Sequence, residues 1–390
     1  MKKKLLIFPF IFLTYFYVFN ISKVIAIYDP LSVPNNKYGI HIVDENDLDN
    51  AAKLVNSSGG DWGYVTMVIR ENDRIVEKWQ NIFGRMQQLH LIPLIRLATN
   101  LEGDVWRKPK LSDVQNWADF LSQLNWITKN RYIILFNEPN HAKEWGGMID
   151  PVEYSQILSS FSATLKAKST DFFILPAGLD ASAPNSNLTM SENTFLLKMK
   201  SDNPFIFDVI DGFVSHSYPN PGFVGNITDS GRGTLKTYLW ELNLLKLMGV
   251  TRDLPIFIAE TGWPHQDGQP YNKHFFSADE VAQFIKQATE LVWNDPQIVA
   301  LTPFILNYQS PPFSNFSWQK PNSGEFYPQY TTYQSIEKIR GEPLLVQTED
   351  KNKILGTESK TLNSTKIPEE KSSPFLKIFN IIFKFISEFI

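Results

Sequence analysis

Two glutamates in this sequence stand where their side chains could do chemistry. Glu138 lies just beyond the apolar run 132–136, and Glu260 directly follows the apolar run 255–259. A carboxylate in such a position is costly to bury unless it is paired or functional. Two opposed carboxyl groups can hydrolyse a glycosidic bond, because one protonates the departing oxygen while the other attacks the anomeric carbon. The sequence therefore predicts this chemistry, provided that the fold brings the two glutamates together.

The segments around these glutamates alternate between apolar, β-branched runs and helical patterns. Strands are expected at 38–43, 62–69, 92–98, 132–136, 172–175, 209–216, 255–259 and 299–306. Helices are expected at 48–55, 74–89, 114–126, 152–165, 192–200, 234–248, 278–293 and 334–339. Strands that alternate with helices form a parallel sheet, and eight of them close a barrel. The sequence therefore predicts an α/β fold, a (β/α)8 TIM barrel over residues 27–346.

The main alternative for such a chain is an open, doubly wound sheet that binds a dinucleotide. That fold normally has fewer strands and a glycine-rich turn after its first strand. Here the corresponding turn is Asp44-Glu45-Asn46, which contains no glycine. In a barrel, the fourth and seventh strands lie on opposite sides of the ring, and catalytic groups stand at their carboxyl ends. Glu138 and Glu260 are therefore expected to face each other across the mouth of the barrel.

The residues around the two glutamates resemble the motifs of glycoside hydrolase clan A, the retaining barrel enzymes that include the cellulase-like family five. The resemblance is carried by Asn-Glu-Pro on the fourth strand and by Glu-Thr-Gly-Trp-Pro on the seventh. It implies that Glu138 is the acid/base and Glu260 the nucleophile. It also implies that Asn137 holds the 2-hydroxyl of the sugar. The resemblance covers residues 38–342.

A third motif of the clan lies at the end of the sixth expected strand. His216 and Tyr218 form a His-x-Tyr pattern there. The resemblance implies that this tyrosine hydrogen-bonds the nucleophile. It implies that the histidine contacts the substrate or the acid/base.

The sequence departs from the clan in two places. The clan usually has an arginine near the end of the second strand, where Arg70 stands, but Arg96 lies within the third strand and almost needs a carboxylate partner. We expect Arg96 to lie beside Glu260 and Arg70 to be a solvated surface residue. The clan's tryptophan at the end of the eighth strand, which forms a platform for the sugar, is missing. Trp263 and Trp318 are the candidates to replace it as substrate-binding residues.

Other catalytic motifs do not occur in the sequence. It contains no cysteine, no His-Glu-x-x-His, no Gly-x-Ser-x-Gly and no phosphate loop, so metal-dependent hydrolysis, esterase and kinase chemistry lack their residues. We therefore expect neither a metal nor a cofactor. His41, near the end of the first strand, could line the cleft, but we expect it to be a hydrogen-bonded structural histidine.

Composition limits the class of partner. The chain is 43% hydrophobic and 14% aromatic, which indicates a sizeable core. Its net charge is −4 at pH 7, so no excess of basic residues is available for nucleic acid, and none is expected as a partner. We expect a carbohydrate as the partner.

The two ends of the chain differ from the middle. Residues 1–26 combine three lysines with a short apolar run and Val24-Ile25-Ala26, which is typical of a secretory signal; an uncleaved anchor is the alternative. Either way, the protein is expected to be exported, extracellular or membrane-associated. Residues 347–374 have the composition of a flexible polar linker.

The last segment, 375–390, has the pattern of an amphipathic helix. Its polar residues, Lys377 and Lys384 among them, recur at steps of three and four and leave a wide apolar face. This pattern favours binding to an anionic membrane surface, and docking on the protein itself is the alternative.

Taken together, these features predict a retaining glycoside hydrolase that cleaves a β-linked sugar or polysaccharide through a covalent glycosyl-enzyme intermediate. One alternative is a carbohydrate-binding barrel with little or no turnover, although a binding protein has no need of both glutamates. A second is a scaffold in which the tail is the functional element.

Overall fold

The computed structural model of this 390-residue protein describes residues 27–346. The signal or anchor expected at 1–26, the linker at 347–374 and the amphipathic helix at 375–390 lie outside the described residues. In the part that is described, no helix combines the length and the apolar character needed to cross a membrane.

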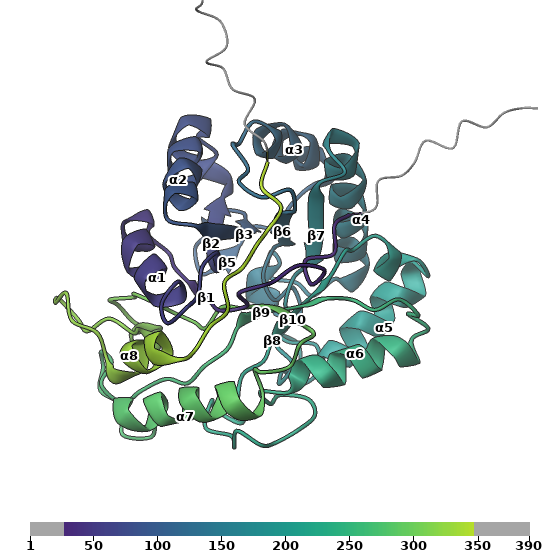
Figure 1. Cartoon of the computed structure of the whole chain (residues 1–390). Coiled ribbons are helices and arrows are strands. Elements are labelled where there is room, and N and C mark those ends of the chain that lie inside the picture. Colours follow the sequence, from purple (N-terminus) through teal and green to yellow (C-terminus); the bar gives the residue numbers. More distant parts are fainter. Residues whose placement is uncertain (1–26, 347–390) are drawn as a thin grey trace, which may run out of the picture. The chain divides into compact units, whose positions relative to one another are not determined.

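Eight parallel strands form the centre of the described chain (Figure 1). Five pair in the order β1-β2-β3-β6-β7, and three pair in the order β8-β9-β10. Bridges between Tyr38 and Leu301 and between Asp180 and His216 join the two groups at both seams. The ring therefore closes, and the predicted (β/α)8 barrel is confirmed. Its strands are β1 (Gly39–His41), β2 (Gly63–Arg70), β3 (Leu91–Ala98), β6 (Arg131–Leu135), β7 (Phe172–Pro176), β8 (Phe213–His216), β9 (Ile256–Glu260) and β10 (Ile298–Leu301).

Helices surround the strands, one after each of them (Figure 1). The side chain of Asp150 caps the fourth helix and that of Ser277 caps the seventh, each by accepting a hydrogen bond from a backbone N–H in the first turn. The last helix contacts both the seventh and the first, which completes the outer ring. The helices are α1 (Leu48–Val55), α2 (Val76–Gln88), α3 (Val114–Ser122), α4 (Pro151–Lys168), α5 (Glu192–Asp202), α6 (Thr237–Leu247), α7 (Ala278–Leu291) and α8 (Pro328–Ser335).

Several elements differ from those expected, most clearly the last helix, the eighth strand and the loop after β3. The helix expected at 334–339 is wrong: α8 begins at Pro328, a residue favoured in the first turn of a helix, and its aromatic and threonine residues show no apolar periodicity. The strand expected at 299–306 ends at Leu301, two residues before Pro303, which has no N–H to donate. The loop after β3 also carries an unpredicted hairpin, β4 (Leu101–Glu102) and β5 (Val105–Trp106).

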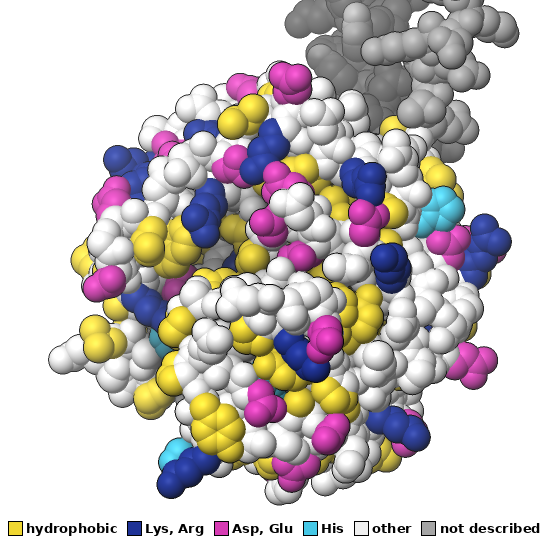
Figure 2. Space-filling model, turned by 90° about the vertical axis from the view of Figure 1, so that its left-hand side faces the viewer, with side chains coloured by type: hydrophobic (Ala, Val, Ile, Leu, Met, Phe, Trp, Pro, Cys, Tyr) yellow, Lys and Arg dark blue, Asp and Glu magenta, His cyan; other side chains and the backbone are white. Residues whose placement is uncertain are grey.

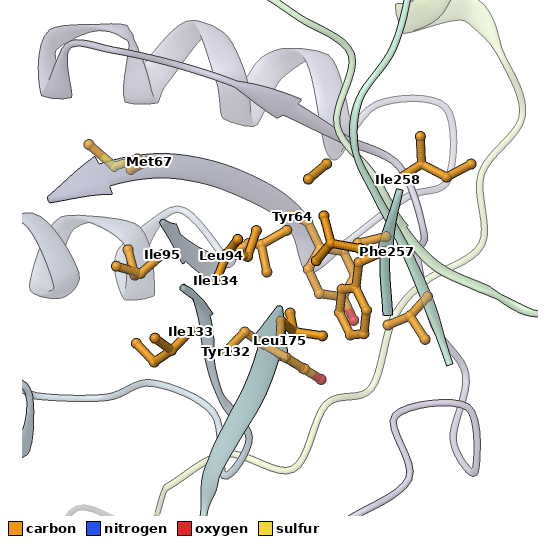
Figure 3. Packing of buried hydrophobic residues seen from close by; sticks show 14 of the residues in the cluster. Tyr64, Met67, Leu94, Ile95, Tyr132, Ile133, Ile134, Leu175, Phe257 and Ile258 are labelled. Atoms are coloured by element: carbon orange, nitrogen blue, oxygen red, sulfur yellow. The ribbon is translucent and has the colours of Figure 1, made fainter. Parts of the chain in front are cut away.

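Aromatic rings fill the interior of the barrel. The ring centroid of Tyr132 lies 6.0 Å from that of Tyr64, 5.0 Å from that of Phe173 and 5.3 Å from that of Phe257. Figure 3 shows Tyr64, Tyr132 and Phe257 together with aliphatic side chains from the neighbouring strands, among them Leu175. The barrel is therefore a packed core rather than a pore, and a ligand can reach only its ends.

Two glutamates are buried outside the barrel interior. Glu192 begins α5, and Glu241 lies on α6, which packs against β8. Both side chains are 0% exposed, and no oxygen of either has a hydrogen-bond partner in residues 27–346. Burial, followed by the charge of Glu241, raises the pKa of Glu192, and burial raises the pKa of Glu241 to about 7. The folded protein therefore holds protons here that an unfolded chain releases near pH ~4.3.

This proton uptake makes a prediction about stability. Because the folded-state pKa values are raised, the contribution of these two glutamates to the free energy of unfolding is greatest below pH ~4.3. It falls as the pH rises through about 7. Replacing Glu241→Gln removes the ionisable group, so the melting temperature should rise at pH 8, by roughly 2–4 °C for each kcal/mol gained, and change little at pH 5. Thermal denaturation followed by circular dichroism at the two pH values measures the difference.

A matched control is Glu290→Gln, which changes an exposed glutamate near the end of α7. It should leave the pH dependence of melting as it is in the wild type. If Glu241→Gln lowers the melting temperature at pH 8 by as much as at pH 5, or by more, the raised pKa of Glu241 in the folded protein is contradicted.

Candidate active site

The backbone around Glu138 is held in an uncommon conformation. Phe136 has a φ of 75° and Glu138 a φ of 32°, both in the left-handed region that side chains rarely adopt. The N–H of Glu138 donates to the carbonyl oxygen of Gly178 at 3.1 Å, and its own carbonyl accepts from the N–H of His141 at 2.9 Å. Non-glycine residues in this region cluster at functional sites, where the surroundings stabilise them. The carboxylate of Glu138 is thereby fixed at the carboxyl end of β6.

Glu260, the last residue of β9, is contacted by three polar side chains. Arg96 donates to Oε1 at 2.6 Å, Tyr218 donates to Oε2 at 3.1 Å, and Nδ1 of His216 lies 3.9 Å from Oε2. Burial opposes ionisation of Glu260, but the charges of His216 and Arg96 outweigh it and hold the pKa of this carboxyl well below its usual range. Glu260 is therefore ionised near neutral pH.

His216 lies between the two carboxylates. Its Nδ1 lies 2.9 Å from Oε1 of Glu138, and one oxygen of Glu138 and one of Glu260 lie within 4.8 Å of each other. Burial lowers the pKa of His216, but the neighbouring charge of Glu260 and the hydrogen bond with Glu138 raise it above its ordinary value. The structure thus brings the two glutamates together across one imidazole.

The ring of His216 fits because residue 178 is a glycine. A Cβ atom on Gly178 would lie 2.3 Å from Cδ2 and 2.4 Å from Nε2 of this histidine. No side chain can occupy that space without displacing the imidazole. Gly178 is a site residue that the sequence analysis missed, although its position just beyond β7 was available as a signal.

Asn137 connects the two halves of the site. Its Oδ1 accepts a hydrogen bond from Arg96 at 2.5 Å, and its Nδ2 donates to Oε2 of Glu144 at 3.4 Å. Glu144 follows in the short helical turn Ala142–Glu144 and is half-buried. Burial and the nearby charge of Glu138 raise the pKa of Glu144. A third carboxyl group therefore lies beside Glu138 and Glu260, on the side of Glu138.

Three residues considered in the sequence lie away from this cluster. Arg70 is exposed at the end of β2, with its guanidinium 5.6 Å from the centroid of Trp106. Trp263 and Trp318 are each only 2% exposed. Trp263 packs against Phe284 and Trp293, and Trp318 packs against Tyr333. The expectation that these two tryptophans bind substrate is wrong, because neither presents a free face to a sugar.

His41 and Phe304 lie near Glu260, and the sequence analysis had considered only His41. Phe304, half-buried after β10, has its ring 5.2 Å from that of His41. Burial and the charge of Arg96 lower the pKa of His41 to about 3. The expectation of a hydrogen-bonded His41 is wrong, because neither ring nitrogen has a partner in residues 27–346. The strand expected at 299–306 would have placed Phe304 within the barrel wall, whereas β10 ends at Leu301 and Phe304 lies in the segment after it.

Asn140 locks the loop that carries Glu138. This asparagine is fully buried, and its side-chain amide donates to the carbonyl oxygens of Asp180 and Met190 at 3.0 Å each. Its Oδ1 accepts from the N–H of Asp180 at 3.2 Å. All three bonds run between the loop after β6 and the loop after β7. Asn140 therefore positions the loop that carries Glu138 without contacting the Glu138 side chain.

The same cluster contains atoms that could ligate a metal. One ligand atom each from Glu138, His216 and Glu260 lie within 4.8 Å of one another, and carboxylate oxygens with imidazole nitrogen suit several divalent ions. Arg96 already places a permanent positive charge against Glu260 and disfavours a second cation there. The arrangement fits proton transfer between the groups better than metal ligation.

The surface shown in Figure 2 has no strongly basic area. Lys and Arg side chains alternate there with Asp and Glu side chains, and hydrophobic groups lie between them. Such a surface lacks the continuous positive potential that attracts a polyanion.

Comparison with known proteins identifies the fold. No family model matches the sequence, and no curated protein matches it. The structure is similar to that of a glucosidase from Croceicoccus marinus, with a TM-score of 0.55 and 11% identity over 78% of this chain and 68% of that chain. It is also similar to a GH39 β-xylosidase from Caulobacter crescentus, with a TM-score of 0.51 and 12% identity over 77% of this chain and 71% of that chain. The chain thus has the (β/α)8 barrel fold that these two glycosidases share.

Proposed function

We propose that this protein is a retaining glycoside hydrolase of the clan A type. The observation that carries the proposal is the distance of at most 4.8 Å between an oxygen of Glu138 and an oxygen of Glu260. Retaining enzymes have carboxyl groups about 5–5.5 Å apart, whereas inverting enzymes need about 6.5–9.5 Å to admit a water molecule. The similar folds of a β-xylosidase and a glucosidase add support.

In the first step, Glu138 donates its proton to the glycosidic oxygen. The bond between that oxygen and the anomeric carbon breaks, and Oε2 or Oε1 of Glu260 forms a new bond to the carbon. Arg96 and Tyr218 keep Glu260 ionised and oriented until it attacks. The leaving group departs as a neutral alcohol.

In the second step, the deprotonated Glu138 takes a proton from a water molecule. The water oxygen attacks the anomeric carbon, the bond to Glu260 breaks, and both glutamates return to their starting states. His216, at 2.9 Å from Glu138, is placed to stabilise the charge that this carboxyl group gains and loses. The sugar is released with its configuration retained.

The proposed substrate is a β-linked sugar or polysaccharide, without a cofactor. The resemblance of Asn137, Glu138 and Glu260 to the clan's motifs supports this class. Export from the cytoplasm belongs to the proposal as well, and residues 1–26 of the sequence support it.

The first prediction tests the nucleophile. Glu260→Ala should abolish hydrolysis of nitrophenyl β-glycosides, because no group remains to attack the anomeric carbon. Added azide should restore turnover with a good leaving group and yield a glycosyl azide of inverted configuration, which nuclear magnetic resonance identifies. Xylosides, glucosides and mannosides form the substrate panel.

The control is the Glu290→Gln variant, which should be as active as wild type. A Glu260→Ala protein with wild-type activity ends the proposed mechanism. If the wild type binds soluble polysaccharides but hydrolyses no member of the panel, the carbohydrate-binding barrel becomes the better description.

A second prediction concerns the two arginines. Arg96→Met should lower kcat/KM by about 100-fold or more, because a preorganised donor to Glu260 is lost. The pKa of Glu260 then rises, so the acidic limb of the pH–rate profile should move to higher pH. Arg70→Met removes an exposed cation of the same type and should change kcat/KM little. The opposite ranking of the two variants contradicts the assignment.

A third prediction concerns export. When the full chain is expressed in a secretion-competent host, mass spectrometry of the protein outside the cytoplasm should give a mature sequence that begins at Ile27. A chain that stays in the cytoplasm with its first 26 residues intact contradicts this part of the proposal.

A further inference from the structure

A polar recess lies on the catalytic face of the barrel, outside the cluster of Glu138 and Glu260. Its volume is about 420 Å³. It is formed by the loop after β7, the loop after β8 and the first turns of α5 and α6. Because both loops follow the carboxyl ends of their strands, the recess opens on the same face as the two glutamates. The residues that matter in its lining are Asn185, Asn193, Thr194, Arg232 and Trp240.

The chemistry of this lining suits a sugar. Trp240 is half-buried, so part of its ring system is open, and Arg232 is exposed. Within residues 27–346, Arg232 makes no ion pair and the side chain of Asn193 makes no hydrogen bond of its own. An aromatic face beside unpaired amide and guanidinium donors offers a pyranose both an apolar surface and partners for its hydroxyl groups.

The recess is connected to the acid side of the site through Asp180. Oδ2 of Asp180 lies 2.9 Å from Nε2 of His141, three residues beyond Glu138. Oδ1 of Asp180 accepts from the N–H and Oγ of Ser182, and Ser182 lies beside Gly233, the neighbour of Arg232. The wall of the recess is therefore continuous with the loops that hold Glu138.

The position of the recess also fits one orientation of a bound polysaccharide. Arg96, His41 and Phe304, which surround the outer side of Glu260, come from β3, β1 and the segment after β10. The recess lies on the opposite arc of the ring, over β7 and β8. If the sugar attacked by Glu260 lies over β1, β3 and the segment after β10, its leaving group points toward β7 and β8, where the recess lies.

We propose that this recess is an outer carbohydrate subsite, which binds a pyranose unit of the substrate on the leaving-group side of Glu138. The inference rests on the proposed glycosidase function and extends it, because it makes the substrate a chain longer than a single glycoside. Trp240 supplies the stacking surface, and Arg232 and Asn193 supply hydrogen bonds to hydroxyl groups.

The test measures binding separately from turnover. The Glu260→Ala variant of the full chain, which cannot digest its ligand, is run in native gels that contain soluble xylan, β-glucan or galactomannan. At least one polysaccharide should retard it, and adding Trp240→Ala should weaken the apparent affinity about tenfold, a change of ~1.4 kcal/mol. If no polysaccharide retards the Glu260→Ala protein, or if Trp240→Ala leaves the retardation unchanged, the subsite does not exist.

A matched control is Phe205→Ala, which removes a 69% exposed aromatic side chain from the loop after α5, at the opposite end of the barrel. It should leave the retardation unchanged, and melting curves should show that both variants are folded. In otherwise wild-type protein, Trp240→Ala should also lower the ratio of kcat/KM for the oligosaccharide to kcat/KM for the nitrophenyl glycoside about tenfold. An unchanged ratio contradicts the subsite, whereas a wild type that binds polysaccharide but turns over neither substrate contradicts the proposed function alone.

Discussion

Arg96 and Glu260 form the ion pair on which the rest of the site depends. The two side chains meet at 2.6 Å, with only 16% and 12% of their surfaces exposed, so each charge lacks most of its hydration. A buried charge that loses its partner is strongly destabilising, which ties the third strand of the barrel to β9 across the mouth. Because Arg96 also donates to Asn137, the same cation orients the residue next to Glu138. One guanidinium thus determines the geometry of both halves of the site.

In this barrel the side chains that stabilise the fold and the side chains that form the polar cluster occupy different places. Aromatic side chains such as Tyr132 and Phe257 fill the interior, so the strands cannot shift inward. The polar groups stand at the carboxyl ends, where Asn140 and Gly178 limit the movement of the loops and of His216. The left-handed backbone of Glu138 is held by one hydrogen bond to the loop after β7 and one within its own loop. The rigid ring therefore supports a site whose own backbone is strained.

Sequence reasoning predicted the barrel and the facing of Glu138 and Glu260 because apolar runs mark strands and a carboxylate just beyond a strand is conspicuous. Arg96 was predictable for a similar reason, since a charge inside an apolar strand needs a partner. Trp263 and Trp318 could not be placed, because a tryptophan near a motif is equally suited to the core and to a sugar. Phe304 was missed because the end of β10 depends on Pro303. The environment of His41 was predicted wrongly because hydrogen bonding cannot be deduced from residue type. The helix α8 has no apolar period that could have shown its boundaries.

The hydrogen bonds of the Asn140 side chain have a consequence for the order in which the folding protein forms its site. The conformation of the Glu138 loop depends on the carbonyl groups of Asp180 and Met190, which leave the ribosome long after Glu138 itself. In a nascent chain that ends between Glu138 and Asp180, the side chain of Glu138 therefore has no fixed position. Arg96 likewise remains without its carboxylate until β9 has emerged and joined the sheet. The cluster therefore assembles only after β9 has been synthesised, and a fragment that ends before Ile256 contains Arg96 and Glu138 without Glu260.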